Sequence, residues 1–242
     1  MSDIPYLSVI IPAYNEAERL PETLVLLKDF LERQEYPSEV IVVDDGSKDR
    51  TVELAKEIQN RFPELRIIEN AQNRGKGAVV RQGILAARGR YRLFMDADNS
   101  TPATEIPHLL KEVPKYEVVI GSRYLHKDSI KIKQSWKRRV LSRAGNFLIQ
   151  LLALPGIKDT QCGFKLFSSE AAGRIFSRQT MTGWSFDFEL LAIAKQLGYV
   201  IKEVPVDWFD AKQSTLRASR AYSSSLRDLL ILRSRLRQHF YH

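Results

Sequence analysis

The stretch LFMDADNST, residues 93–101, joins an apolar run to two carboxylates placed one residue apart, and a proline follows it directly. A short apolar run bounded by turn-forming residues favours a buried β-strand. Asp96 and Asp98 after such a strand allow two interpretations. They suit Mg²⁺ or Mn²⁺, since hard ions of this kind take one or two carboxylates and complete their shell with waters and substrate phosphates. They are also typical of a turn. The stretch alone leaves both interpretations open.

Apolar, β-branched runs alternate with helical patterns through the first 120 residues. Strands that alternate with helices predict βαβ units and a mostly parallel sheet buried on both faces. The sequence therefore predicts an α/β fold. The expected strands are 7–11, 39–44, 65–69, 91–95 and 117–121, and the expected helices are 16–34, 49–61, 75–88 and 103–112.

The alternation breaks down after residue 121, and no internal repeat or low-complexity linker follows. We predict one domain over residues 1–210, with flanking helices and a helical C-terminal elaboration, and a basic amphipathic tail over residues 211–242. The elements expected in the second half are a helix-like segment at 140–154, a loop over DTQCGFKLF (159–167), a helix at about 186–197 and a strand at 202–208.

Four of the expected strands end in polar clusters. In an open α/β sheet, ligands bind beyond the carboxyl ends of the strands. Turn formation explains one such cluster easily, but four clusters with five aspartates on one edge would repel each other without cations or hydrogen-bond donors. We therefore predict a ligand-binding site at this edge. The clusters are PAYNE (12–16), DDGSKD (44–49), DADNS (96–100) and GSRY (121–124).

The segment NRGKGAVVRQG (73–83) is a glycine-bearing loop that opens a helix. It does not match the phosphate-binding pattern of P-loop proteins, because Gly77 and Ala78 follow Lys76. Its glycines allow close backbone approach, and Lys76 could neutralise a phosphate or a developing charge. An ordinary glycine-rich helix entry explains the glycines equally well.

The net charge of +8 is concentrated in two segments. Residues 131–143 carry six basic residues and no acidic one, and residues 211–242 carry Lys212, six arginines and one aspartate. Such segments indicate polyanionic partners: nucleic acid, phosphates or an anionic membrane. Neither segment has the interleaved aromatic residues of a platform for single-stranded nucleic acid or matches a recognised DNA-binding motif, so we do not expect a nucleic-acid-binding module.

Compartment is indicated by cysteine content and apolar patterning. Cys162 is the single cysteine, which excludes an intramolecular disulfide and suits a reducing compartment. The N-terminal stretch lacks the basic region of a signal peptide, and no run approaches the roughly 18 apolar residues of a spanning helix. We expect a cytoplasmic protein, peripheral on the cytoplasmic face of a membrane.

The motifs together resemble glycosyltransferase family 2, whose nucleotide-sugar fold is called GT-A. VIIPAYNE, VVDDGSKDRT, NRGKGAVVRQG, DAD and IGSRY follow the usual order of that family. DTQCGFKLF and GWSFDFELL in the second half resemble its dolichyl-phosphate β-glucosyltransferase branch and the bacterial polyprenyl-phosphate relatives. The resemblance extends from about residue 6 to about residue 210.

The resemblance implies transfer of glucose from UDP-glucose to a polyprenyl or dolichyl phosphate, with inversion at the anomeric carbon and with Mg²⁺ or Mn²⁺ as cofactor. It implies that the metal lies on Asp96 and Asp98, with Asp98 the first choice. Arginine suits the acceptor phosphate because its planar fork donates two hydrogen bonds. By position, the uridine and ribose contacts are Pro12, Tyr14, Glu16, Val43 and Asp45 with Asp44 nearby, the diphosphate contacts are Asp96, Ala97 and Asp98, and the acceptor-phosphate arginines are Arg123 and Arg138.

Such a reaction needs little catalytic machinery. The second pKa of a phosphate monoester is near 6, so the acceptor is already a nucleophile at neutral pH and a general base is optional. Asp159 and Asp187 are the candidate bases or orienting groups. Asp159 could instead cap a loop, and Asp187 could form a salt bridge to the basic segment.

Alternatives stay open for both activity and anchoring. A GDP-mannose-dependent polyprenyl-phosphate mannosyltransferase, a transferase with a sugar hydroxyl as acceptor, and a non-catalytic relative fit the same motifs less well. A lipid acceptor requires membrane contact, which the basic segments and residues 131–157 could supply. The tail either meets the membrane or packs on the domain or on a second copy, and a membrane-protein partner is a further option. The apolar helical face of the tail comprises Leu226, Leu229, Leu230, Leu236 and Phe240.

Overall fold

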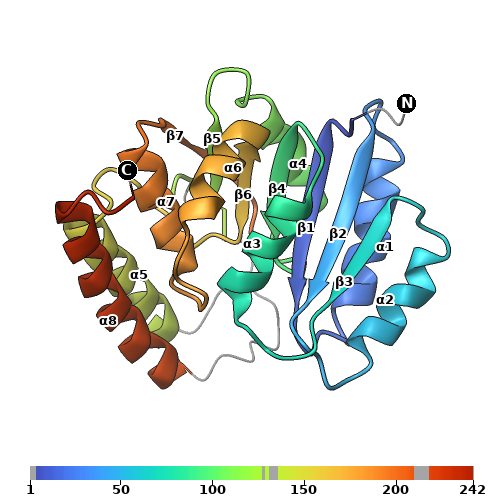
Figure 1. The fold of residues 1–242 in the computed structure, drawn as a ribbon, viewed down its shortest axis with the longest axis horizontal. Coiled ribbons are helices and arrows are strands. Elements are labelled where there is room, and N and C mark those ends of the chain that lie inside the picture. The colour runs from blue at the N-terminus through green and yellow to red at the C-terminus, as the bar shows by residue number, and fades with distance from the viewer. Residues whose placement is uncertain (1–3, 127–128, 131–135, 210–217, 242) are drawn as a thin grey trace.

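The structure is a computed structural model. It describes residues 4–126, 129–130, 136–209 and 218–241, and the side chains of 136–142 and 218–224 lie outside that description. Within the described residues, seven strands form one sheet in the order β3-β2-β1-β4-β6-β5-β7 (Figure 1). The strands are β1 (Leu7–Ala13), β2 (Ser38–Asp44), β3 (Leu65–Glu69), β4 (Tyr91–Met95), β5 (Val118–Ser122), β6 (Phe164–Ser168) and β7 (Ile201–Pro205).

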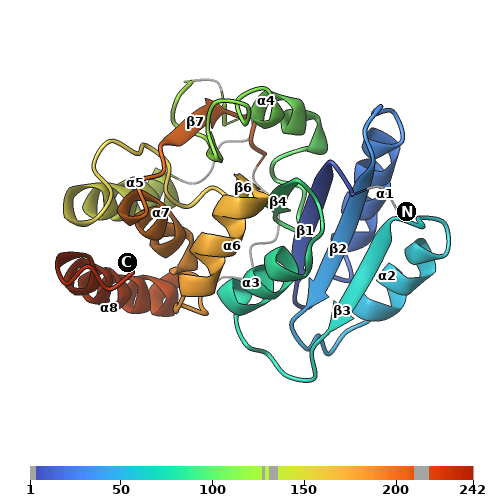
Figure 2. The same ribbon diagram turned by 45° about the horizontal axis from the view of Figure 1, so that its top comes forward.

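Helices cover both faces of this sheet (Figures 1 and 2). Successive residues of β1 point to opposite faces, as the twofold period of a strand requires. Ile10 belongs to the core beneath α3, α6 and α7, whereas Val9 and Ile11 belong to the core beneath α1 and α4. The helices are α1 (Leu20–Leu31), α2 (Thr51–Gln59), α3 (Lys76–Ala86), the 3₁₀ turn η1 (Ala103–Glu105), α4 (Ile106–Leu110), α5 (Trp136–Leu152), α6 (Ser169–Arg178), α7 (Phe186–Gln196) and α8 (Ala218–Arg237).

The predicted α/β fold with a mostly parallel sheet is confirmed. Every neighbouring pair of strands is parallel except the two pairs that β6 makes with β4 and β5. The helical C-terminal elaboration is also present, as α5 and α8 lie side by side at the end of the molecule away from α1 and α2 (Figures 1 and 2). Within the described residues, no helix is long and apolar enough to cross a bilayer.

The loop predicted over residues 159–167 is wrong for its second half, which forms strand β6. Strand β6 lies between β4 and β5, and its register pairs Met95 with Phe164. Lys165 breaks the apolar pattern on which strand prediction depends. Its side chain is fully buried, and its ammonium lies 2.5 Å from the Asp187 carboxylate. A buried charge of this kind is tolerated because it is paired.

The tail helix α8 packs against α5 and α7. Leu229 and Leu232 are buried in the core that α7 also lines, whereas Leu226 and Leu230 are half exposed. The apolar face expected of the tail is therefore divided between an inward and an outward side. The tail therefore packs on the domain and also presents an exposed apolar surface.

A buried carboxylate holds the end of the chain in place. Glu189 is fully buried, and it accepts hydrogen bonds from the Tyr241 hydroxyl at 2.7 Å and from the Met181 and Thr180 amides at 2.8 and 3.1 Å. The Thr182 carbonyl of the same loop accepts a hydrogen bond from the Ala78 amide at 3.2 Å. The end of the chain is thus connected, through one loop, to the start of α3.

Replacing Tyr241 by Phe removes one donor from this buried carboxylate. We expect Tyr241→Phe to lower the free energy of unfolding by about 1 kcal/mol, measured by urea denaturation, because the buried Glu189 Oε1 then loses one of its donors and keeps those from Thr180 and Arg235. Tyr199→Phe is the matched control, since its hydroxyl only accepts an exposed 3.3 Å hydrogen bond from Arg174. Equal effects of the two substitutions would contradict the role of Glu189.

Candidate active site

The four polar clusters meet at one edge of the sheet, as predicted. Strands β1, β2 and β4 are mutually parallel, and β5 runs the same way because β6 is antiparallel to both β4 and β5. Their carboxyl ends therefore lie together. A cleft of about 380 Å³ opens at this edge beside Asp98. Its lining is completed by Arg19, Glu22, Thr23, Asn99, Pro102 and Phe209.

Acidic and basic side chains alternate at this edge. Lys76 Nζ lies 2.6 Å from Asp96 Oδ1. Arg19 donates two hydrogen bonds to Glu16, at 2.6 and 2.7 Å, and its Nη1 lies 3.8 Å from Asp98 Oδ2. Two cations thus accompany the three carboxylates, which explains how the acidic residues gather without a prohibitive repulsion.

The charged forms of these groups compete with burial. Burial raises the pKa of Asp98, and the neighbouring Asp96 carboxylate raises it further. The pKa of Glu16 is also raised by burial, although its bonds to Arg19 oppose the shift. Burial alone would lower the pKa of Lys76, but the Asp96 and Asp187 carboxylates outweigh it and raise that pKa. Lys76 therefore carries its positive charge at neutral pH.

The structure is compatible with both interpretations of the Asp-Ala-Asp stretch, as a turn and as a metal site. Asp98 Oδ1 accepts a hydrogen bond from the Ser100 amide at 3.0 Å, and Asn99 has a φ of 51°, in the left-handed region that asparagine tolerates. The Ala97 carbonyl accepts a hydrogen bond from the Thr23 hydroxyl at 2.7 Å. One oxygen of Asp98 shapes the turn, and its other oxygen faces Arg19.

Gly163 supports the Asp96 carboxylate from the side. A Cβ atom added to Gly163 would lie 2.1 Å from Asp96 Oδ2 and 2.6 Å from Oδ1. Real side chains do not approach so closely, so this position needs a residue without a side chain. The contact follows from the pairing of Met95 with Phe164, which brings the residues next to each partner together.

The end of β2 contributes two aspartates with different surroundings. Both oxygens of Asp45 are used by the glycine loop, since they accept hydrogen bonds from the Arg74 amide at 2.6 Å and the Gly75 amide at 2.9 Å. Asp44 Oδ2 accepts hydrogen bonds from the Gly46 and Ser47 amides, both at 2.9 Å. Asp44 Oδ1 is buried and has no hydrogen-bond partner among the described residues. Asp44 thus has one buried carboxylate oxygen that the described residues leave without a hydrogen bond.

The other predicted donor contacts differ in exposure. Tyr14 is 40% exposed at the end of β1, so its ring is accessible. Pro12 and Val43 pair across β1 and β2. The Val43 side chain is fully buried in the core against α3. Val43 could therefore meet a nucleotide through its backbone but not through its side chain.

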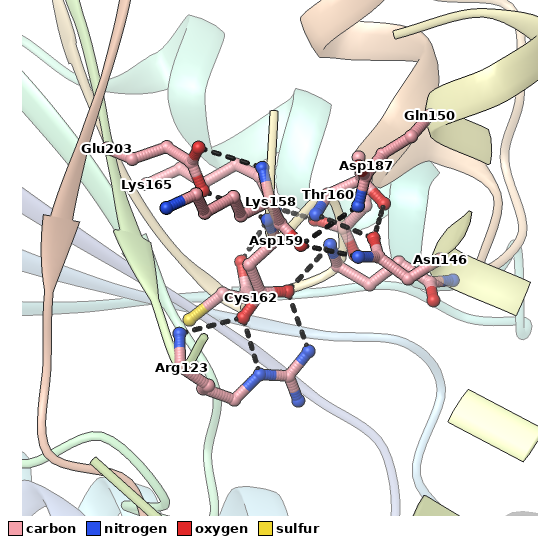
Figure 3. A network of polar contacts seen from close by, with 11 residues as sticks. Arg123, Asn146, Gln150, Lys158, Asp159, Thr160, Cys162, Lys165, Asp187 and Glu203 are labelled. Carbon is pink, nitrogen blue, oxygen red and sulfur yellow. Dashed lines mark hydrogen bonds and ion pairs between the residues drawn. The ribbon is translucent and has the colours of Figure 1, made fainter. Parts of the chain in front are cut away.

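Arg123 and Asp159 form a buried pair (Figure 3). Asp159 Oδ2 accepts hydrogen bonds from Arg123 Nε at 2.7 Å and from the Arg123 amide at 2.9 Å, and Oδ1 accepts one from Nη2 at 2.8 Å. Burial alone would raise the pKa of Asp159, but the guanidinium outweighs it and lowers that pKa. Glu203 holds the loop by accepting hydrogen bonds from the Lys158 and Asp159 amides at 2.8 and 2.9 Å. Arg138 belongs to the part of α5 whose side chains lie outside the described residues.

Asp187 is held by a second buried pair, with Lys165. The Lys165 ammonium also donates a hydrogen bond to the Cys162 carbonyl at 2.6 Å. Burial raises the pKa of Asp187, and the Lys165 and Lys76 cations oppose part of that shift. The structure therefore gives each candidate base a basic partner: Arg123 for Asp159 and Lys165 for Asp187.

Comparison with known proteins identifies the family. The Glycosyl transferase family 2 domain matches residues 8–176. The chain belongs to glycosyltransferase family 2. It is 38% identical over 244 residues to the dolichyl-phosphate β-glucosyltransferase of Homo sapiens, an alignment that covers 95% of this chain and 75% of that protein. The enzyme of the same name from Drosophila melanogaster is 40% identical over 241 residues, covering 93% of this chain and 74% of that protein.

A solved structure shares the fold of this glycosyltransferase. Glucosyl-3-phosphoglycerate synthase from Mycobacterium tuberculosis, in complex with Mn²⁺, UDP and glucosyl-3-phosphoglycerate, superposes with a TM-score of 0.69. The two are 20% identical, and the match covers 95% of this chain and 80% of that chain. This likeness establishes the GT-A architecture around the site.

The carboxylates at the sheet edge fit a divalent cation. Within the described residues, no group of three or more His, Cys, Asp or Glu side chains is arranged to hold a metal. Mg²⁺ and Mn²⁺ do not require such a cage, because one or two carboxylates, waters and substrate phosphates complete their shell. Asp96 and Asp98 form a donor set of that kind.

Several site residues of this glycosyltransferase were not predicted from the sequence. Arg19 lies three residues after Glu16, a spacing that predicts contact on a helix, so a signal for it exists. Gly163 and Lys165 depend on strand β6, and Glu203 depends on the neighbouring strand β7. No local pattern marks these three.

Gly163→Ala tests the support of Asp96. We expect the added methyl group to displace the carboxylate and to weaken binding of Mn²⁺ with UDP by about tenfold, roughly 1.4 kcal/mol, in isothermal titration calorimetry. Gly173→Ala is the matched control, because a Cβ at that helical position meets nothing within 4 Å. Unchanged binding in Gly163→Ala would show that the carboxylate does not depend on this glycine.

Cys162 should be unreactive in the folded chain. Burial raises the pKa of its thiol to about 12, and the residue is 1% exposed. Since the thiolate is the reactive form, we expect negligible alkylation by iodoacetamide at pH 8 and rapid alkylation in 8 M urea, followed by mass spectrometry. Rapid alkylation of the folded chain would contradict the placement of β6.

Proposed function

We propose that this glycosyltransferase moves glucose from UDP-glucose to the phosphate of a polyprenyl or dolichyl lipid, with inversion at the anomeric carbon. The proposal is supported by the identity to dolichyl-phosphate β-glucosyltransferases over nearly the whole chain, including the enzyme of Saccharomyces cerevisiae at 36% over 250 residues. The donor-side support is the pair of carboxylates at the sheet edge beside an accessible Tyr14.

The observation that carries the acceptor assignment is that both candidate bases are engaged in ion pairs. Asp159 forms an ion pair with Arg123, and Asp187 forms one with Lys165. Both carboxylates are also buried, so neither is exposed to an incoming alcohol. A phosphate acceptor needs no such group, because it is largely a dianion at neutral pH. The site is therefore suited to a phosphate nucleophile rather than to a sugar hydroxyl.

The proposed step is a single displacement. An oxygen of the acceptor phosphate forms a bond to C1 of glucose, and the bond from C1 to the UDP oxygen breaks, with its electron pair leaving on UDP. Arg123 is fixed by Asp159, which takes two of the five N–H groups of its guanidinium, and would orient the acceptor phosphate. Lys76 would stabilise the departing diphosphate. Mg²⁺ or Mn²⁺ on Asp96 and Asp98 would supply further positive charge to the same leaving group.

Access to a lipid acceptor is supported by the surfaces of α5 and α8. Among the described side chains, Arg143 on α5 and Arg227 and Arg237 on α8 are exposed on the same helices as the apolar ones, and the sequence carries six basic residues over 131–143. Apolar side chains bordered by basic residues match the surface of an anionic bilayer, where each Lys or Arg contributes about 1 kcal/mol. We propose this surface, which comprises Phe147, Leu148, Leu151, Leu226 and Leu230, as the membrane contact.

A transfer assay separates this proposal from its alternatives. We expect glucose transfer from UDP-glucose to dolichyl phosphate with Mn²⁺ or Mg²⁺ present, loss of transfer with EDTA, and no transfer to dolichol, the corresponding alcohol. GDP-mannose and UDP-galactose are the competing donors. Preferred use of GDP-mannose would replace the donor assignment, and glucosylation of dolichol would overturn the acceptor argument.

Vesicle sedimentation tests the membrane surface. We expect the wild-type chain to sediment with anionic vesicles at low salt and to be released as salt screens the charges. A Phe147→Ser, Leu151→Ser double variant should sediment at least severalfold less. The matched control is Val25→Ser, Leu26→Ser, which changes two comparably exposed residues of α1. Equal losses in both double variants, or equal sedimentation with neutral vesicles, would contradict the assignment.

A further inference from the structure

Lys76 occupies an unusual position for a residue expected to contact phosphate. It is the first residue of α3, and its ammonium lies 2.6 Å from Asp96 Oδ1 and 4.9 Å from the centre of the Trp184 ring. Its side chain is 15% exposed, so the ion pair is largely sheltered from water. A positive charge therefore already lies at one of the two carboxylates that suit a metal.

Lys76 is the cation that the structure places on the buried oxygen of Asp96. Asp96 Oδ1 is buried and accepts no hydrogen bond from the described residues, so the ion pair is what neutralises it. The other oxygen, Oδ2, is the atom that a Cβ at position 163 would meet first. The Asp96 side chain is one-third exposed, so a metal can approach this carboxylate, but Lys76 already neutralises part of its charge.

Lys76 has few other anions to move to. Asp187 acts on it electrostatically, but that carboxylate already pairs with Lys165 at 2.5 Å. Asp98 lies near Arg19, at 3.8 Å from its Nη1. A cation that displaced Lys76 from Asp96 would therefore leave an ammonium in a sheltered place without an anion of its own, which is costly.

We propose that Lys76 holds the cation position on Asp96 while the site is empty and gives it up only when a metal arrives together with a diphosphate. The diphosphate provides the anion that the displaced ammonium needs. Metal and nucleotide then bind with positive coupling, and each must strengthen the other by the same factor. This inference rests on the metal and nucleotide assignment of the proposed function, but it concerns the order of binding and not the sugar or the acceptor.

The test is a titration with Mn²⁺, followed by electron paramagnetic resonance of the unbound ion, with no nucleotide, with UDP and with GDP. For the wild-type chain we expect weak binding of Mn²⁺ alone and binding that is tightened about tenfold or more by the preferred nucleotide. For Lys76→Met we expect Mn²⁺ alone to bind about tenfold more tightly than in the wild type, and the strengthening by nucleotide to shrink.

Two further variants control the experiment. Lys76→Arg keeps a positive charge and should retain the weak binding of Mn²⁺ alone. Lys195→Met removes a lysine whose ammonium donates to the Pro155 carbonyl, far along the chain from the carboxylates, and should titrate like the wild type. Thermal unfolding of each variant checks that it is folded, and Lys76→Gln replaces Lys76→Met should the latter fail that check.

The outcomes separate this inference from the proposed function. If removal of the Lys76 charge leaves the affinity for Mn²⁺ alone unchanged or weaker, Lys76 does not compete with the metal and the inference is overturned. If GDP rather than UDP produces the coupling, the donor assignment fails while the exchange of cations stands. Absence of glucose transfer in the enzymatic assay would likewise leave the titration result unaffected.

Discussion

Carboxylates that gather at one edge of a sheet and are shielded from water must each be compensated by a cation or by hydrogen-bond donors, and this requirement organises the site. Asp96 pairs with Lys76, Asp98 and Glu16 face Arg19, and Asp187 pairs with Lys165. The basic partners come from separate parts of the chain: Arg19 directly precedes α1, Lys76 begins α3, and Lys165 lies near the start of β6. The local fold and the charge balance are therefore not independent, because moving any of these elements would leave a sheltered charge without a partner.

Strand β6 makes this arrangement possible. Its antiparallel insertion between β4 and β5 brings the second half of the chain against the Asp-Ala-Asp turn, so that Gly163 confines Asp96 and Lys165 neutralises Asp187. The segment that leads into β6 also carries Asp159, which fixes the guanidinium of Arg123 (Figure 3). The groups that we propose for the donor and those that we propose for the acceptor thus share one support. With both candidate bases engaged by basic residues, the site offers orientation and positive charge, which are what a phosphate nucleophile requires.

Much of this site could be predicted from the sequence, and each part that could not be predicted has its own physical reason. The runs that form β1, β2 and β4 are continuous and apolar, so the sequence alone predicts that their carboxyl ends, with Asp45, Asp96 and Asp98, lie on one edge of the sheet. Strand β6 was not predicted, because Lys165 interrupts its pattern and only a distant residue, Asp187, makes that lysine tolerable. The outward and inward sides of α8 could not be separated either, because helical spacing does not reveal which neighbouring helix it packs against.

The exchange of cations on Asp96 is most directly measured by two crystal structures of this chain, one without ligands and one with Mn²⁺ and UDP. In the first we expect Lys76 Nζ at about 2.6 Å from Asp96 Oδ1, as here. In the second we expect the metal on the Asp96–Asp98 pair and Lys76 on an oxygen of the diphosphate. Lys76 still in contact with Asp96 Oδ1 in the presence of bound Mn²⁺ and UDP would contradict the exchange.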